Sequence, residues 1–202
     1  EALDYFEHAQ HALGPLGFQP LFHLKFDPFT DLMDATALVL LHAANRDLVM
    51  ALHAEGPVRL VQLEFSTEFE NGDEVNTNNS PQLPLDAVMK PNKQIYWFPD
   101  TQDPSELYRA HTALCSAHGK SPKKNPPLGE DLVQTVKRGI REDFEHAASR
   151  GLFRWDPDDD CYIMSLRGAY SLAWPNMFPF SILYRFRRSS HDRQALLRAS
   201  GR

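Results

Sequence analysis

The sequence predicts an α+β fold in which a mainly antiparallel sheet of about five strands is flanked by helices. Three observations lead to this prediction. Short segments that are either apolar throughout or alternate between apolar and polar residues occupy much of the first half of the chain, and short turns join them, which favours antiparallel pairing. Two segments at 1–13 and 103–117 have apolar residues at helical spacing. The last third of the chain is predicted to form a helix, a hairpin and a broken helix.

The clearest strand pattern lies in residues 58–80, where apolar and polar residues alternate before and after the turn dipeptide Asn71-Gly72. A two-residue turn would mix the two faces of the hairpin. A three-residue loop that ends at Gly72 in the left-handed region instead places Thr67 opposite Val75. We therefore predict the three-residue loop, and we expect the rest of the chain to cover the apolar face of this hairpin.

The other elements of the first part follow from periodicity and from turn residues. The helix that starts after Asp103 has proline at its first position and is ended by Gly119. In chain order we expect a helix over 1–13, strands over 21–26, 36–42 and 48–54, the hairpin of 58–80, an edge strand over 94–98 and the helix over 103–117.

The C-terminal part begins near Leu128 with the longest predicted helix, over 130–149. A hairpin over 152–164 follows, and then an apolar and aromatic segment that prolines interrupt, with a short basic helix over 191–199. We predict a single α+β domain over 1–202 and leave open a sub-boundary in the proline-rich stretch near 120–129.

Charge and composition exclude several functions. The chain has 202 residues, of which 42% are hydrophobic, and 21 basic and 27 acidic residues give a formal charge of −6. No nucleic-acid partner is expected from this balance. The charge is uneven, since residues 185–202 hold six Arg and one Asp and carry +5, which leaves −11 on the rest. Two cysteines indicate a reducing, cytoplasmic setting, with membrane association as a further expectation from the C-terminal segment.

Motifs for cofactors and metals are absent or weak. The sequence contains no Walker loop, no GxGxxG and no GxSxG elbow, so we expect no cofactor. His111, Cys115 and His118 share one face of a helix at a spacing that could hold zinc, but His111 and His118 also belong to the expected buried stripe of that helix. Acidic residues at 156–160 form a turn that we interpret as solvated rather than calcium-binding. We therefore expect no metal.

A polar strand end in the 66–79 hairpin is the candidate ligand site. Asn side chains and a Thr lie beside polar residues of the neighbouring strand, and they could line a small pocket or simply cap the strand. The candidate ligand-binding residues are Ser66, Glu68, Asn76, Thr77 and Asn78.

The segment 169–188 combines aromatic residues with arginines. This combination is typical of membrane interfaces, where rings lie at headgroup depth and Arg meets anionic lipid, but it also suits a segment packed on the body of the protein. The candidate membrane or partner contacts are Trp174, Phe178, Phe180, Tyr184, Arg185, Arg187 and Arg188.

Several short motifs resemble a pattern in a loose set of uncharacterised bacterial proteins. They are residues 66–72 (STEFENG) with 75–79 (VNTNN), Leu16-Gly17-Phe18, Glu106-Leu107-Tyr108 with His111, and 165–169 (SLRGA). Members of that set often carry hydrophobic segments outside this domain, which implies membrane association. The set has no assigned activity, so the resemblance implies one domain type and no catalytic residue.

The leading hypothesis from the sequence is a non-enzymatic binding or scaffold domain that works near a membrane on its cytoplasmic side, through an anionic membrane surface or a protein partner. The alternative is a small hydrolase or ligand-processing enzyme that uses His111 with polar groups of the 66–79 hairpin. This alternative requires His111 to lie in a concave pocket together with a carboxylate such as Glu64 or Glu68.

Overall fold

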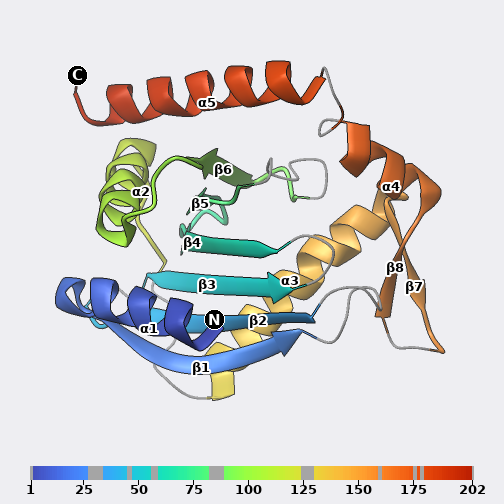
Figure 1. The fold of residues 1–202 in the computed structure, drawn as a ribbon, viewed down its shortest axis with the longest axis horizontal. Coiled ribbons are helices and arrows are strands. Elements are labelled where there is room, and N and C mark those ends of the chain that lie inside the picture. The colour runs from blue at the N-terminus through green and yellow to red at the C-terminus, as the bar shows by residue number, and fades with distance from the viewer. Residues whose placement is uncertain are drawn as a thin grey trace.

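The computed structural model describes residues 2–26, 34–44, 47–55, 59–81, 89–123, 130–158, 161–174, 177 and 180–201. Its order of elements confirms the α+β class, and Figure 1 shows the sheet with helices around it. The elements are α1 (Ala2–Leu13), a 3₁₀ turn (Gly14–Leu16), β1 (Phe18–Phe26), β2 (Asp34–His42), β3 (Leu48–Glu55), β4 (Leu60–Glu68), β5 (Glu74–Asn78), β6 (Lys93–Trp97), α2 (Pro104–His118), α3 (Glu130–Ser149), β7 (Phe153–Asp156), β8 (Cys161–Met164), α4 (Leu166–Ala173) and α5 (Phe180–Ala199).

The main sheet has six strands in the order of the sequence, from β1 to β6. Neighbouring strands are antiparallel from β1 to β5, as short connections require, whereas β6 pairs with β5 in parallel. The predicted edge strand near the end of the first part is therefore present as β6 at the edge of the sheet. The hairpin β7–β8 forms a separate two-stranded sheet.

The β4–β5 hairpin has the predicted register. Thr67 pairs with Val75, and the Phe69 N–H donates to the Asp73 carbonyl at 2.8 Å, so a three-residue loop joins the strands. Gly72 has a φ of +84°, a conformation that strains any residue with a Cβ. The parity of the apolar residues thus predicted this register correctly.

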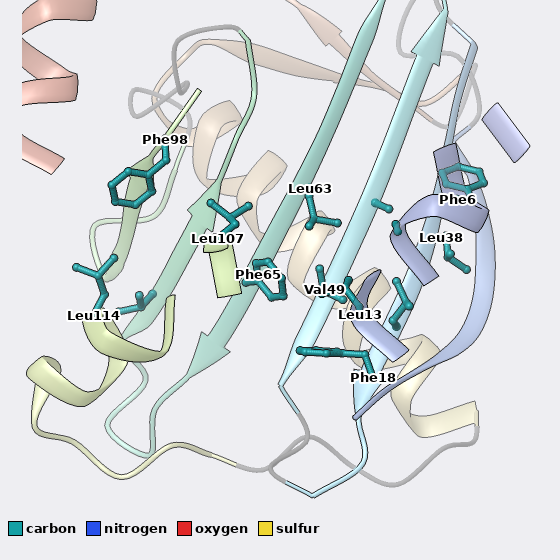
Figure 2. Close-up of a cluster of buried hydrophobic side chains, with 14 of the residues drawn as sticks. Phe6, Leu13, Phe18, Leu38, Val49, Leu63, Phe65, Phe98, Leu107 and Leu114 are labelled. Carbon is teal, nitrogen blue, oxygen red and sulfur yellow. The ribbon is translucent and has the colours of Figure 1, made fainter. Parts of the chain in front are cut away.

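One face of the sheet, the α1/α2 face, carries the apolar core. Figure 2 shows core side chains of α1, α2 and the strands meeting over this face. Phe65 is fully buried at the centre and contacts both Phe18 and Tyr108, with ring centroids 5.7 and 5.2 Å away. Burial of one such ring contributes about 1.5–3 kcal/mol, so the core is the main source of stability. Its labelled members are Phe6, Leu13, Phe18, Leu38, Val49, Leu63, Phe65, Phe98, Leu107 and Leu114.

The opposite face, the α3 face, is crossed by the long helix α3, which passes behind the strands in Figure 1. Side chains alternate along a strand, so residues between the core positions point to this face, among them Val39, Glu64 and Ser66. The β7–β8 hairpin packs on the end of α3, where Phe144 stacks on Tyr162 with centroids 5.5 Å apart.

The structure corrects two predicted boundaries. The first strand starts at Phe18 rather than at residue 21, and the last helix starts at Phe180 rather than at His191. Pro179 directly precedes the first turn of α5, a position where proline is compatible with a helix start, so the interruption ends earlier than we predicted. Within the described ranges, none of the helices is long and apolar enough to cross a membrane.

Candidate functional site

A cavity of about 530 Å³ lies between the α3 face of the sheet and helix α3. Its size is that of a pocket for a small molecule. Strands β2, β3, β4 and β5 supply one wall of the cavity, the start of β6 supplies a second wall, and one side of α3 supplies the third. Three of the predicted ligand-binding residues, Ser66, Glu68 and Asn76, line this cavity.

The inner wall of the cavity is a polar network centred on Lys93. The Lys93 ammonium lies 2.9 Å from Asp143 Oδ2 on α3 and 3.2 Å from Glu74 Oε1 on β5. Ser66 Oγ donates to the same Glu74 Oε1 at 2.9 Å. Asn76 Nδ2 donates to Glu64 Oε1 at 2.6 Å. The network links three strands to α3, so it fixes the helix on the sheet.

The charges of this network perturb one another. Burial raises the pKa of the Glu64 carboxyl, and nearby Lys93 and Asn76 only partly oppose this effect. Burial also disfavours the charge of Lys93, but the surrounding carboxylates outweigh it and hold the pKa of the ammonium above its ordinary value. Coupled carboxyl groups in a cavity are a frequent feature of functional sites.

The rest of the lining is apolar inside and charged at the rim. Val39 and Met50 from the sheet face Val136 and Ile140 from α3. Ion pairs occupy the rim, where Lys90 meets Glu142 at 2.9 Å and Lys123 meets Glu68 at 2.7 Å. A ligand would therefore find an apolar surface beside an inner polar wall.

The two other predicted ligand residues do not line the cavity. Thr77 points to the α1/α2 face, because it is offset by one residue from Asn76, and its hydroxyl contacts His111. Asn78 is buried, and its side-chain oxygen accepts from the Ser80 N–H at 3.3 Å. The five predicted residues thus divide between a cavity wall and the internal packing of the sheet.

His111 is held in a buried hydrogen-bonded chain. Its side chain is 1% exposed, with Nε2 at 2.9 Å from Thr67 Oγ1 and Nδ1 at 3.0 Å from Thr77 Oγ1. Thr67 donates its own proton to Asp47 Oδ1, so Thr67 accepts from Nε2–H, and Nδ1 accepts from Thr77. Burial lowers the pKa of His111 to about 3, which keeps the ring neutral.

This position removes His111 from the cavity. The sheet separates the ring from Glu64 and Glu68, which lie on the α3 face. The enzymatic alternative requires His111 and a carboxylate in one concave pocket, and the geometry does not provide this arrangement. Cys115 lies next to His111, with Sγ 3.5 Å from Nε2, and burial raises the pKa of its thiol to about 12. Both groups therefore belong to the core of the α1/α2 face.

The second candidate surface is formed by α4 and the first half of α5. Gly168 of α4 packs directly on the Leu152 carbonyl, where a Cβ would lie only 2.0 Å from the oxygen. This contact turns the opposite side of α4 to solvent, and Leu166, Tyr170 and Trp174 follow one another there at helical spacing. The Trp174 ring stacks on Phe180, the first residue of α5, with centroids 4.2 Å apart, so the row of side chains on α4 continues onto α5.

Many of the exposed side chains of these helices are large and apolar. Leu166 is 92% exposed, Phe186 77%, Leu183 65% and Tyr170 63%. We call this region the apolar C-terminal surface, formed by Leu166, Tyr170, Trp174, Phe180, Ile182, Leu183, Tyr184 and Phe186. Of the predicted membrane or partner contacts, Trp174, Phe180 and Tyr184 belong to it, and Phe178 lies outside the described residues.

The predicted arginines have different roles. Arg185 lies over the Trp97 ring, 5.8 Å from its centroid, and donates to the Pro81 carbonyl. Arg188 pairs with the buried Asp192 at 2.8 Å and donates to the Ile95 carbonyl of β6. Arg187 is exposed on α5. Arg188 is thus part of the packing between α5 and the sheet rather than of a free surface.

Sequence reasoning missed Lys93, Asp143 and Gly139 as members of the cavity. Lys93 and Asp143 are distant in the chain and meet only because α3 crosses the sheet. The available signal was Gly139, since glycine inside a long helix lowers its stability and indicates a special environment. Comparison of the chain with known protein families, with functionally described proteins and with solved structures finds no significant match.

Proposed function

We propose that this protein is a non-enzymatic binding or scaffold domain that attaches peripherally to an anionic membrane surface on the cytoplasmic side. The observation that supports the proposal best is the apolar C-terminal surface, whose large side chains are exposed on a folded domain. Contiguous exposed apolar side chains mark sites of interaction with proteins or membranes. Tyr170 and Trp174 favour the membrane, because aromatic residues are enriched at the depth of lipid headgroups.

The distribution of charge also supports attachment through the C-terminal part of the chain. Residues 185–202 carry +5 and the remainder of the chain −11. An anionic bilayer attracts the first part and repels the second, and each basic residue near such a surface contributes about 1 kcal/mol. The domain would therefore approach the bilayer with α5 foremost and the sheet away from it.

The test is flotation of the intact protein with vesicles of phosphatidylcholine that contain phosphatidylglycerol, at low and moderate salt. We expect binding that weakens with salt, because the arginines of α5 act through a screened interaction. The variant Phe186→Glu is expected to weaken binding about 30-fold, which corresponds to the loss of about 2 kcal/mol of apolar burial.

The matched control is Leu3→Glu, which makes the same kind of exchange at an exposed position of α1, 70% accessible and remote from α5 in Figure 1. We expect it to bind like the wild type. Wild-type protein that fails to float with anionic vesicles at low salt would contradict the proposal. An equal loss in both variants would also contradict it, since the effect would then not belong to the C-terminal surface.

A further inference from the structure

We propose that the cavity between the sheet and α3 binds a small organic cation, an alkylammonium or alkylguanidinium, with its charged group at Glu64 and Asp143 and its carbon chain against Val39, Met50 and Ile140. This site is separate from the apolar C-terminal surface, and the inference does not depend on membrane attachment. Its basis is the charge balance of the inner wall, one acceptor that is unsatisfied among the described residues, Asp143 Oδ1, and the free space of the cavity.

Negative charge exceeds positive charge at the inner wall. Glu64, Glu74 and Asp143 all interact electrostatically with one ammonium, that of Lys93. At the rim, Lys90 and Arg138 both pair with Glu142, and Lys123 pairs with Glu68. The inner wall therefore offers a place for a second positive charge, and an anion would meet three carboxyl groups there.

Acceptors also exceed donors at this wall. Asp143 Oδ2 accepts from Lys93 at 2.9 Å, whereas the other oxygen, Oδ1, is buried and has no hydrogen-bond partner within the described chain. Within the part of the chain that the structure describes, the Glu64 carboxyl accepts one side-chain hydrogen bond, from Asn76. Buried acceptors in folded proteins are nearly always paired, so an unpaired oxygen on a residue that lines the cavity indicates a missing donor. A primary ammonium provides three N–H donors and a guanidinium up to five.

Gly139 provides space for the ligand. It lies inside α3 and lines the cavity, and apart from its chain neighbours and the nearby backbone of α3, a Cβ at this position would meet no described atom within 4 Å. Close packing therefore does not require glycine here, although glycine costs about 1 kcal/mol relative to alanine inside a helix. The open position leaves room next to Val136 and Ile140, which suits a short carbon chain.

An organic cation fits this lining better than a metal ion. Among the residues that the structure describes, no three His, Cys, Asp or Glu side chains are grouped closely enough to hold a metal. The apolar part of the lining also has no role in binding a bare ion, whereas it can cover the carbon chain of an amine.

The test is isothermal titration calorimetry of the intact protein with n-pentylammonium and n-butylguanidinium, compared with pentanoate and pentan-1-ol. At least one of the two cations is expected to bind tenfold more tightly than the acid or the alcohol. Binding should also release protons, seen as an enthalpy that varies with the buffer, because a cation favours ionisation of Glu64, whose pKa burial raises.

Two variants locate the site. Glu64→Gln keeps the shape and the hydrogen bond to Asn76 but removes the charge, and we expect at least a tenfold loss of cation binding and no proton release. Gly139→Leu fills the space next to Ile140 and is expected to abolish binding without removing a contact. The matched control, Glu106→Gln, changes an exposed acid on α2, on the other face of the sheet, and should bind normally.

Each of the following results would overturn the inference. The first is that neither cation binds to the wild type at concentrations up to about 10 mM, where even a site with a Kd of about 10 mM would be half occupied. The second is that pentanoate binds to the wild type as tightly as the cations do. The third is that Glu64→Gln binds the cations as tightly as the wild type does. A thermal unfolding curve is measured for each variant alongside the titrations. The cation binding of Gly139→Leu and Glu64→Gln is interpreted only for a variant that is folded.

Discussion

At the scale of single residues, the neutral state of His111 shows how the core uses a polar side chain. Both ring nitrogens have partners, Thr67 on one side and Thr77 on the other, so the ring is buried without an unsatisfied group. Protonation would add a donor at Nδ1, where Thr77 would then have to reverse its hydroxyl, and would place a charge in an apolar region. The buried site therefore selects the neutral ring.

This selection makes stability depend on pH. The pKa of His111 is about 3 in the folded protein, below its ordinary value near 6.5, so the unfolded chain binds the proton more strongly. The free energy of unfolding should therefore fall as the pH decreases below about 6.5, by about 2 kcal/mol between pH 7.5 and 5 for this residue alone. Urea unfolding at several pH values measures the slope.

The variant His111→Gln isolates this contribution, because glutamine does not titrate and can still form hydrogen bonds. We expect the variant to be less stable at pH 7.5 but to lose about 2 kcal/mol less on acidification than the wild type. His11→Gln, at an exposed position of α1, serves as the control and should keep the wild-type slope. A slope that is the same in all three proteins would show that His111 is not the responsible group.

At the scale of elements, α5 protects the edge of the sheet. The outer side of β6 has no neighbouring strand in the described structure, and an unpaired edge invites association with other chains. Asp192 of α5 accepts the Trp97 N–H at 2.9 Å, and Arg188 donates to the Ile95 carbonyl. The Arg188–Asp192 pair thus provides one acceptor and one donor, as an additional strand would.

Removal of the acceptor should expose this edge. Asp192 has 0% exposure, and Asp192→Ala removes the buried carboxylate that accepts from Arg188 and from the Trp97 N–H, so we expect a loss of about 3–5 kcal/mol. Asp100→Ala removes the exposed partner of Arg193 on the same helix and should cost less than about 0.5 kcal/mol. Urea unfolding gives both values, and hydrogen exchange should show faster exchange of the Trp97 amide in Asp192→Ala only. Equal stability of the two variants would refute this role of Asp192.

The same elements show what the sequence can predict. Alternation of side chains determined the β4–β5 register and placed Ser66, Glu68 and Asn76 on one face, because strand periodicity is local. The contact between Lys93 and Asp143 depends on where α3 crosses the sheet, and the apolar residues of α3 do not specify that place. The sequence predicts too short a final helix, because proline is typical of helix interruptions and of helix starts alike.

At the scale of the whole molecule, the two faces of the sheet differ from each other in polarity, and the acidic body differs from α5 in charge. The α1/α2 face is a closed apolar core, whereas the α3 face holds a cavity with charged walls. The acidic body and the basic α5 give the molecule an electrostatic polarity, and the apolar C-terminal surface lies at the basic end. Under our proposal the polarity sets the orientation on a bilayer, which leaves the cavity facing away from the lipid.

Tryptophan fluorescence can test this orientation, because the three tryptophans lie in different places. Trp174 is in the apolar C-terminal surface, Trp97 is buried beside α5, and Trp155 is on the hairpin strand that ends at the acidic turn of Asp156 and Asp158. Repulsion from anionic lipid should keep this turn, and Trp155 with it, away from the bilayer. Lipids brominated in their acyl chains quench only indoles that enter the membrane. We therefore expect strong quenching of Trp155→Phe, which retains Trp174, and little quenching of Trp174→Phe, which retains Trp155. The reverse pattern would mean that the hairpin, rather than α4 and α5, meets the lipid, and the assignment of the binding surface would then be wrong.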